Sequence, residues 1–244
     1  MKESFETHFQ LVEGEGGFST DSVSPSDLEL FRNVVISHYR NALLNSGFED
    51  EAGLNQPIDS YHQLSQKLDH VVIWETKNRV LTEEELETFL SADFFKDMKE
   101  QIGEISISDE VGIGHPAIYL RLVRPTPFYD VGPLHVDKWF WDLENIYSPK
   151  GYKRVKFWFS LWNEQGLSGL RYVKGSHTQE YEYVGEKRYG RMKPCFDEKK
   201  YDLEITPFCS KPGDFLVFND SLLHGGMIGG GNTRVSFEFT LFIK

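Results

Sequence analysis

Three residues of this 244-residue chain could together bind a divalent metal ion: His135, Asp137 and His224. In an extended segment, residues two positions apart point to the same side, so His135 and Asp137 could present an imidazole and a carboxylate to one ion. A chance His-x-Asp pair is unsurprising in a chain with eight histidines, and the alternative is a surface pair at a strand end. The pair therefore needs a third ligand before it indicates a metal site.

His224 supplies that candidate third ligand. It follows an expected strand at 215–218 and precedes Gly225-Gly226, which would let the backbone pass close to a bound group. Two histidines and one carboxylate make a facial triad, which leaves coordination positions open on Fe(II) and is typical of non-haem oxygenases. Zinc is the competing metal, because it also binds sites with three protein ligands. We expect these three residues to be both metal ligands and catalytic residues.

Arg234 and Ser236 form a second pair on one strand face, beginning ten residues after His224. A guanidinium binds a carboxylate through two hydrogen bonds, and a nearby hydroxyl can add another. The pair suits the distal carboxylate of a dicarboxylic keto acid that chelates the metal. A surface salt bridge is the alternative for Arg234, but its place beside Val235 and Phe237 favours a buried ionic role.

Two neighbouring strands offer further candidates for the site. Tyr119 and Arg121 share one face of the strand before the metal motif, and Lys156 and Trp158 share one face of the strand after it. Any of them could contact the co-substrate or line the substrate pocket, although a salt bridge explains Arg121 equally well. Trp139 follows the motif directly and could wall the substrate pocket, with packing at its rim as the alternative.

A cationic cluster at 187–193 is conspicuous in a chain whose net charge is −12. Its members Arg188 and Arg191 could receive an anionic substrate. A solvated loop is the alternative, because nearby acidic residues dilute the local charge.

Overall composition narrows the classes of function. The strong negative charge argues against general binding to nucleic acid, and the two cysteines are too few for a disulfide framework. The N-terminal residues lack a secretory pattern, and no stretch reaches the roughly 18 apolar residues that span a bilayer. We therefore expect a cytoplasmic protein acting on a small molecule, while the oligomeric state stays unknown.

The first ~105 residues carry helix signals. Ser24-Pro25-Ser26-Asp27 resembles a capping box before apolar residues at helical spacing, and Gly47 is a plausible C-terminal cap. A second helix is expected within 60–70. Thr82 opens another capping box, and the helical pattern ends at Gly103.

Strand signals dominate from about residue 117 onward. Segments 117–123, 155–162, 170–173, 215–218 and 234–243 are rich in β-branched and aromatic residues and are separated by Gly and Pro turns. This indicates a mainly β fold with flanking helices: a sandwich, barrel or jelly roll. We expect one domain over 1–244, with the helical segment 1–105 packed on a catalytic core 106–244 and an irregular insertion near 175–202.

Several of these segments together resemble the phytanoyl-CoA dioxygenase family of Fe(II)/2-oxoglutarate-dependent oxygenases. The resemblance covers roughly residues 115–244 and rests on 170–177, 211–218, His224-Gly225-Gly226 and Arg234-Val235-Ser236. One departure is Lys174, where the family usually has proline before Gly-Ser-His. This could alter the turn but does not touch the metal motif.

The resemblance implies a double-stranded β-helix, which is a cupin-like jelly roll. It implies that His135, Asp137 and His224 hold Fe(II), that Arg234 and Ser236 hold 2-oxoglutarate, and that O2 is consumed with release of succinate and CO2. Hydroxylation of a small molecule is the expected reaction. Halogenation is less expected, because related halogenases lack the carboxylate that Asp137 supplies.

Two other functions remain open at this point. One is a cupin-like metalloenzyme that does not use 2-oxoglutarate, although the Arg-x-Ser placement argues against it. The other is a non-catalytic binding protein with the same fold, which usually requires loss of a metal ligand. The sequence does not identify the substrate.

Overall fold

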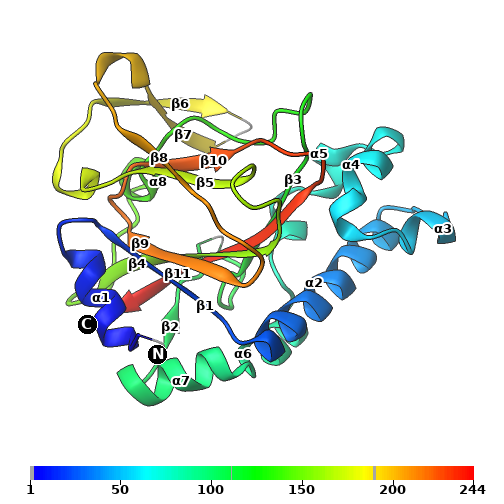
Figure 1. The fold of residues 1–244 in the computed structure, drawn as a ribbon, viewed down its shortest axis with the longest axis horizontal. Coiled ribbons are helices and arrows are strands. Elements are labelled where there is room, and N and C mark those ends of the chain that lie inside the picture. Colours follow the sequence, from blue (N-terminus) through cyan, green and yellow to red (C-terminus); the bar gives the residue numbers. More distant parts are fainter. Residues whose placement is uncertain (1–2, 111, 189–190) are drawn as a thin grey trace.

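Two antiparallel sheets form the core of the chain (Figure 1). The structure is a computed structural model that describes residues 3–110, 112–188 and 191–244, with Arg191 described by its backbone alone. The larger sheet runs in the order β1, β9, β4, β11, β2, and β3 also pairs with β11. Its strands are β1 Phe18–Ser22, β2 Ser106–Ile107, β3 Tyr119–Val123, β4 Lys153–Trp162, β9 Asp214–Asn219 and β11 Arg234–Ile243.

A smaller sheet and a hairpin lie on the other side of the molecule (Figure 1). The smaller sheet has the order β10, β5, β8, and the hairpin pairs β6 with β7. Their bounds are β5 Gly169–Val173, β6 Tyr183–Arg188, β7 Arg191–Phe196, β8 Ile205–Phe208 and β10 His224–Met227. The mainly β class with flanking helices is therefore confirmed.

Helices from the first 102 residues contribute to the apolar cluster on the outer face of the larger sheet, and α1, α6 and α7 lie below the sheet in the view of Figure 1, whereas α8 lies beside the smaller sheet. The expected capping box at Thr82 is present, Ser24 accepts a hydrogen bond from the backbone N–H of Asp27, and Gly103 ends its helix with a positive φ of 82°. The helices are α1 Phe5–Glu13, α2 Pro25–Asn45, α3 Glu51–Leu54, α4 Tyr61–Leu64, α5 His70–Ile73, α6 Glu83–Leu90, α7 Asp93–Ile102 and α8 Asp137–Glu144.

The strands β4 and β11 alternate between two chemically different faces. On the outer face, Phe157 and Phe239 join one buried apolar cluster with side chains of α2, α6 and α7. On the inner face, toward the smaller sheet, β11 carries Arg234, Ser236, Glu238 and Thr240, while β4 carries Lys156, Trp158 and Ser160. Because successive side chains of a strand point to opposite sides, one face of these strands packs against the helices and the other is polar.

Two expectations about local structure were wrong. The segment 175–202 is not irregular, because it contains the hairpin of β6 and β7. Asp137 does not continue an extended strand from His135: it is the first residue of α8, and Val136 is the helix cap. The imidazole and the carboxylate are brought together by a strand-to-helix turn rather than by strand alternation.

His38 links α2 to α6 and gives the fold a pH dependence. Its Nδ1 lies 2.7 Å from Oε2 of Glu85, and its Nε2 lies 2.9 Å from the backbone oxygen of Asn78. A carboxylate and a carbonyl only accept, so both ring nitrogens must donate, which requires the charged imidazolium. Burial opposes that charge, but the bonds to Glu85 and Asn78 outweigh it and raise the pKa of His38 above its ordinary value.

A histidine whose pKa is raised by folding stabilises the protein fully below its ordinary pKa and loses that contribution as the pH rises through the raised value. We therefore expect the difference in unfolding free energy between wild type and His38→Gln to be largest below the ordinary histidine pKa and to shrink as the pH rises above it. Equilibrium urea denaturation at each pH measures it. A difference that stays constant with pH would contradict the imidazolium assignment.

Candidate metal centre

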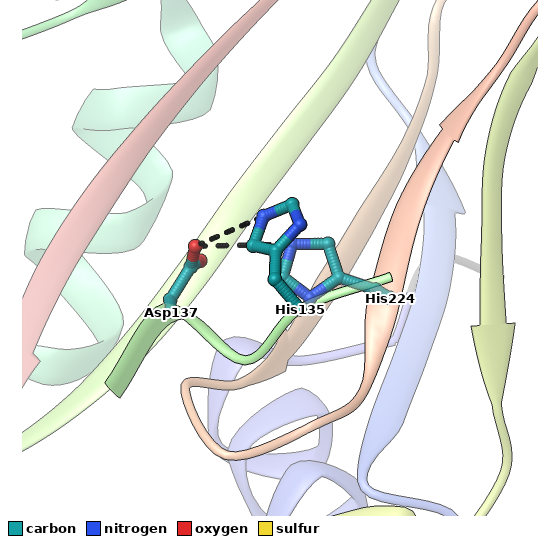
Figure 2. Close-up of side chains that lie close together, drawn as sticks. All are labelled: His135, Asp137 and His224. Carbon is teal, nitrogen blue, oxygen red and sulfur yellow. Dashed lines mark ion pairs between the residues drawn. The ribbon is translucent and has the colours of Figure 1, made fainter. Parts of the chain in front are cut away.

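The three predicted ligands converge where the smaller sheet meets the start of α8 (Figure 2). His224 is the first residue of β10 and Asp137 the first of α8. His135 forms an isolated antiparallel bridge with His224. The backbone nitrogen of His135 lies 2.8 Å from the backbone oxygen of His224, and the reverse nitrogen-to-oxygen distance is 2.9 Å. These two backbone hydrogen bonds fix the two imidazoles side by side.

The ligand atoms share one small region of space. Oδ1 of Asp137 lies 3.8 Å from Nε2 of His135 and 3.8 Å from Nε2 of His224. The other ring nitrogens lie 3.0 Å from the carbonyl of Pro133 and 2.9 Å from that of Leu222. A carbonyl only accepts, so each Nδ1 donates, and each Nε2 keeps its lone pair directed at the shared region. This is the tautomer that metal binding requires.

The environment also suits a bound cation. Burial lowers the pKa of His135 to about 4, so its ring is neutral at pH 7. Burial opposes ionisation of Asp137, but nearby groups, the Lys156 ammonium foremost, outweigh it and keep the pKa of Asp137 below its ordinary value. Within the described residues, the buried Oδ2 of Asp137 has no partner. Two imidazoles and one carboxylate fit Fe(II).

Glycines beside His224 let the ligand-bearing segments approach closely. A Cβ at Gly226 would lie 2.6 Å from Cγ1 of Val131, and one at Gly225 would lie 3.3 Å from a methyl group of Leu134. The first contact is too close for any side chain. The glycine pair therefore allows residues 131–135 to pass directly against β10 and deliver His135.

Arg234 and Ser236 lie buried on the inner face of β11, with 3% and 0% of their surfaces exposed. Arg234 donates from Nη1 to the backbone oxygen of Gly169. Its Nε and the Ser236 hydroxyl have no partner among the described residues, which also offer Arg234 no salt bridge. Burial lowers the pKa of Arg234 to about 10, so it stays charged at pH 7. A buried cation without a counter-ion, beside an unsatisfied hydroxyl, fits a bound carboxylate.

Two of the other co-substrate candidates, Arg121 and Lys156, already have acidic partners. Arg121 donates to Glu238 at 3.0 and 2.6 Å. The ammonium of Lys156 lies 3.4 Å from both carboxylate oxygens of Glu110. Burial raises the pKa of Tyr119 to about 12, so its phenol stays neutral. Their direct contact with 2-oxoglutarate stays a prediction.

The candidates for the substrate pocket are spread apart. Trp139 is buried on α8, where it stacks on Tyr183 of the hairpin at 4.6 Å between ring centroids. Trp158 is buried on the inner face of β4, with the Arg234 guanidinium 5.6 Å from its ring. Arg188 lies on the exposed hairpin and donates to Glu186 at 2.7 Å, whereas the side chain of Arg191 lies outside the described residues.

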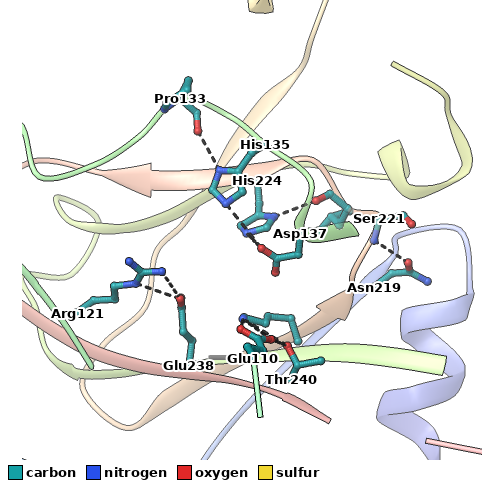
Figure 3. A network of polar contacts seen from close by, with 12 residues as sticks. Glu110, Arg121, Pro133, His135, Asp137, Asn219, Ser221, His224, Glu238 and Thr240 are labelled. Atoms are coloured by element: carbon teal, nitrogen blue, oxygen red, sulfur yellow. Dashed lines mark hydrogen bonds and ion pairs between the residues drawn. The ribbon is translucent and has the colours of Figure 1, made fainter. Parts of the chain in front are cut away.

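Sequence reasoning missed two acids on the inner face, Glu110 and Glu238 (Figure 3). Glu238 could have been found, because it shares strand parity with Arg234 and Ser236. Glu110 had no comparable signal, since it lies in a loop before β3 and reaches Thr240 only in the folded chain.

A jelly-roll core with an inner 2-His-1-carboxylate site and a buried arginine defines a non-haem Fe(II)/2-oxoglutarate-dependent dioxygenase. The family model described as phytanoyl-CoA dioxygenase (PhyH) matches residues 49–228, and the chain belongs to this family. Its cofactors are accordingly Fe(II), 2-oxoglutarate and O2. No curated protein matches the sequence.

Solved structures share the fold at low sequence identity. EvdO2 from Micromonospora carbonacea var. aurantiaca, complexed with 2-oxoglutarate, has a TM-score of 0.57 and 11% identity, covering 100% of this chain and 92% of that chain. EctD from S. alaskensis with 2-oxoglutarate and 5-hydroxyectoine has a TM-score of 0.56 and 14% identity, with coverage of 99% and 76%. The carbocyclase SnoK from nogalamycin biosynthesis has a TM-score of 0.54 and 12% identity, with coverage of 99% and 85%.

One further property concerns membranes. Among the described residues, no helix combines the length and the apolar character needed to cross a bilayer.

Proposed function

We propose that this dioxygenase hydroxylates a small-molecule substrate and releases succinate and CO2. His135, Asp137 and His224 hold the iron, while Arg234 and Ser236 hold the distal carboxylate of 2-oxoglutarate. The observation that carries the proposal is the buried guanidinium of Arg234, which has no carboxylate partner among the described residues and lies beside the unsatisfied Ser236 hydroxyl. A buried charge left without a partner is costly, so a carboxylate ligand accounts for its presence.

The protein contributes orientation and charge to this reaction. Bound Fe(II) supplies the activation of O2 that couples 2-oxoglutarate decarboxylation to substrate oxidation. The carbonyls of Pro133 and Leu222 orient the two imidazoles, and the backbone bridge between His135 and His224 sets their spacing. Arg234 and Ser236 bind the far end of the co-substrate and thereby direct its keto acid end toward the triad. Partly exposed His135 leaves the site open to the substrate.

The proposal is tested by succinate formation. The protein is loaded with Fe(II) under anaerobic conditions and then receives 2-oxoglutarate and O2. Slow succinate release is expected even without the substrate, and it should vanish in His135→Ala. Tight metal binding without succinate would instead favour the metalloenzyme that does not use 2-oxoglutarate, and failure to bind Fe(II), Co(II) or Mn(II) below millimolar concentration would favour a binding protein.

Three finer points remain predictions: an anionic substrate received at Arg188 and Arg191, the cytoplasmic location, and the absence of a nucleic-acid partner. The pairing of Arg188 with Glu186 reduces the net positive charge on the hairpin. It therefore gives the first of these predictions no added support.

A further inference from the structure

A second acidic side chain lies close to the two histidines and the one carboxylate that are the proposed metal ligands. Glu238 projects from the inner face of β11, and Figure 3 shows it on the side toward which Asp137 points. Its side chain is 16% exposed. Among the described residues, His135, Asp137 and His224 are the only group of histidine and acidic side chains whose ligand atoms could share one metal ion. Glu238 thus lies near the proposed metal site but is not one of its ligands.

Glu238 faces the triad from the inner side of β11 and is paired with Arg121 of the neighbouring strand (Figure 3). Burial raises the pKa of Glu238, but the nearby cations Arg121 and Lys156 outweigh it and lower that pKa to about 2. The residue is therefore a carboxylate at neutral pH, in the field of the metal site.

Arg121 holds this carboxylate by one oxygen. Its Nε and Nη2 donate to the same atom, Oε1 of Glu238, at 3.0 and 2.6 Å. Among the described residues, no group hydrogen-bonds Oε2, and that atom is not one of the fully buried unsatisfied atoms. Arg121 comes from β3, where it lies opposite Ser236, so it draws Glu238 sideways toward the neighbouring strand.

Carboxylates are good ligands for divalent iron, manganese and cobalt. A free Glu238 would offer a fourth protein ligand and occupy a position that the keto acid end of 2-oxoglutarate needs. An oxygenase site must keep such positions open. The pairing of Glu238 with Arg121 therefore bears on which metal coordination positions stay open, as well as on the stability of the sheet.

We propose that Arg121 is a positioning residue that holds Glu238 away from the metal and so reserves the coordination positions of 2-oxoglutarate. The inference rests on the proposed function, because it needs the metal at His135, Asp137 and His224. In this proposal Arg121 does not bind 2-oxoglutarate directly. It affects 2-oxoglutarate binding by controlling where the Glu238 carboxylate lies.

A double-mutant cycle separates these two roles. Arg121→Met, Glu238→Gln and the double variant are loaded with Co(II), and 2-oxoglutarate affinity is measured by calorimetry, with the visible Co(II) spectrum recorded alongside. We expect Arg121→Met to weaken 2-oxoglutarate binding at least about 10-fold, to leave Co(II) affinity equal or higher, and to change the Co(II) spectrum. Glu238→Gln should behave like wild type, and the double variant should recover to within about 3-fold.

A control is Arg124→Met, which breaks the pair of Arg124 with Asp130 just beyond β3; these side chains are 12% and 9% exposed, against 41% and 16% for Arg121 and Glu238. It should lower stability without changing 2-oxoglutarate affinity or the Co(II) spectrum. The proposal is overturned if the double variant is as weak as Arg121→Met, if Arg121→Met binds 2-oxoglutarate normally, or if Arg124→Met has the same effect. A wild-type protein that binds Co(II) but no 2-oxoglutarate would refute the proposed function itself.

Discussion

Replacing His224 with alanine is expected to abolish succinate formation and to weaken Fe(II) or Co(II) binding by more than about 100-fold. Loss of an outer partner of a metal ligand costs roughly 10- to 100-fold in metal affinity, and loss of a ligand should cost more. His224 is buried, its Nδ1 is fixed by the carbonyl of Leu222, and its Nε2 is aimed at the region shared with Asp137. Metal affinity is measured by calorimetry, and succinate by chromatography.

The backbone bridge between His224 and His135 does not depend on the imidazole, so the fold should persist in the variant. Circular dichroism and urea denaturation check that point. His115→Ala is the matched control, because His115 bonds only to the carbonyl of Pro116 among the described residues and should leave metal binding unchanged. Normal metal affinity in His224→Ala would remove this residue from the ligand set.

Replacing Arg234 with leucine should raise the KM for 2-oxoglutarate by on the order of 100-fold and leave metal affinity nearly unchanged. Truncating one partner of a buried, hydrogen-bonded charge pair costs about 2–5 kcal/mol, and about 3 kcal/mol corresponds to the stated factor. Leucine removes every donor of Arg234, together with the cation that lies over the Trp158 ring. Initial rates of succinate formation at varied 2-oxoglutarate measure the effect.

Ser236→Ala provides a graded comparison, since loss of one neutral donor should cost about 1 kcal/mol, or roughly 5-fold. Arg32→Leu is the control on the outer side of the sheet, where Arg32 donates to the backbone oxygen of Leu161. If Arg234→Leu had the KM of wild type, a metalloenzyme that does not use 2-oxoglutarate would become the better account.

The site was largely foreseeable because its residues carry distinctive chemistry in short motifs. A His-x-Asp pair, a histidine before two glycines and an Arg-x-Ser pair each limit the possible ligand. The route by which Asp137 reaches His135 was not foreseeable, because either a strand or a strand-to-helix turn would bring the two side chains together. The partners of Arg121 and Lys156 also depend on strand register, which local sequence does not specify.

The fold was foreseeable where local signals are strong. The helices capped by Ser24 and Thr82 begin where expected, strand β11 matches its predicted segment, and β4 begins at Lys153, before the predicted start at residue 155. Strand β1 was missed because its sequence, Phe-Ser-Thr-Asp-Ser, is polar, and it exists through pairing with β9. The hairpin of β6 and β7 was missed for the same reason: its long-range packing under Trp139 outweighs a polar, exposed sequence.

The different chemistry of the two faces of β11 limits which insertions and deletions this strand can tolerate. Phenylalanines that hold the helices alternate one by one with the residues that face the metal site. Inserting or deleting a single residue within Val235–Thr240 would turn aromatic rings toward the co-substrate and bury charged groups among the helices. A change in the length of this strand should therefore be tolerated less well than a conservative substitution at one of its positions.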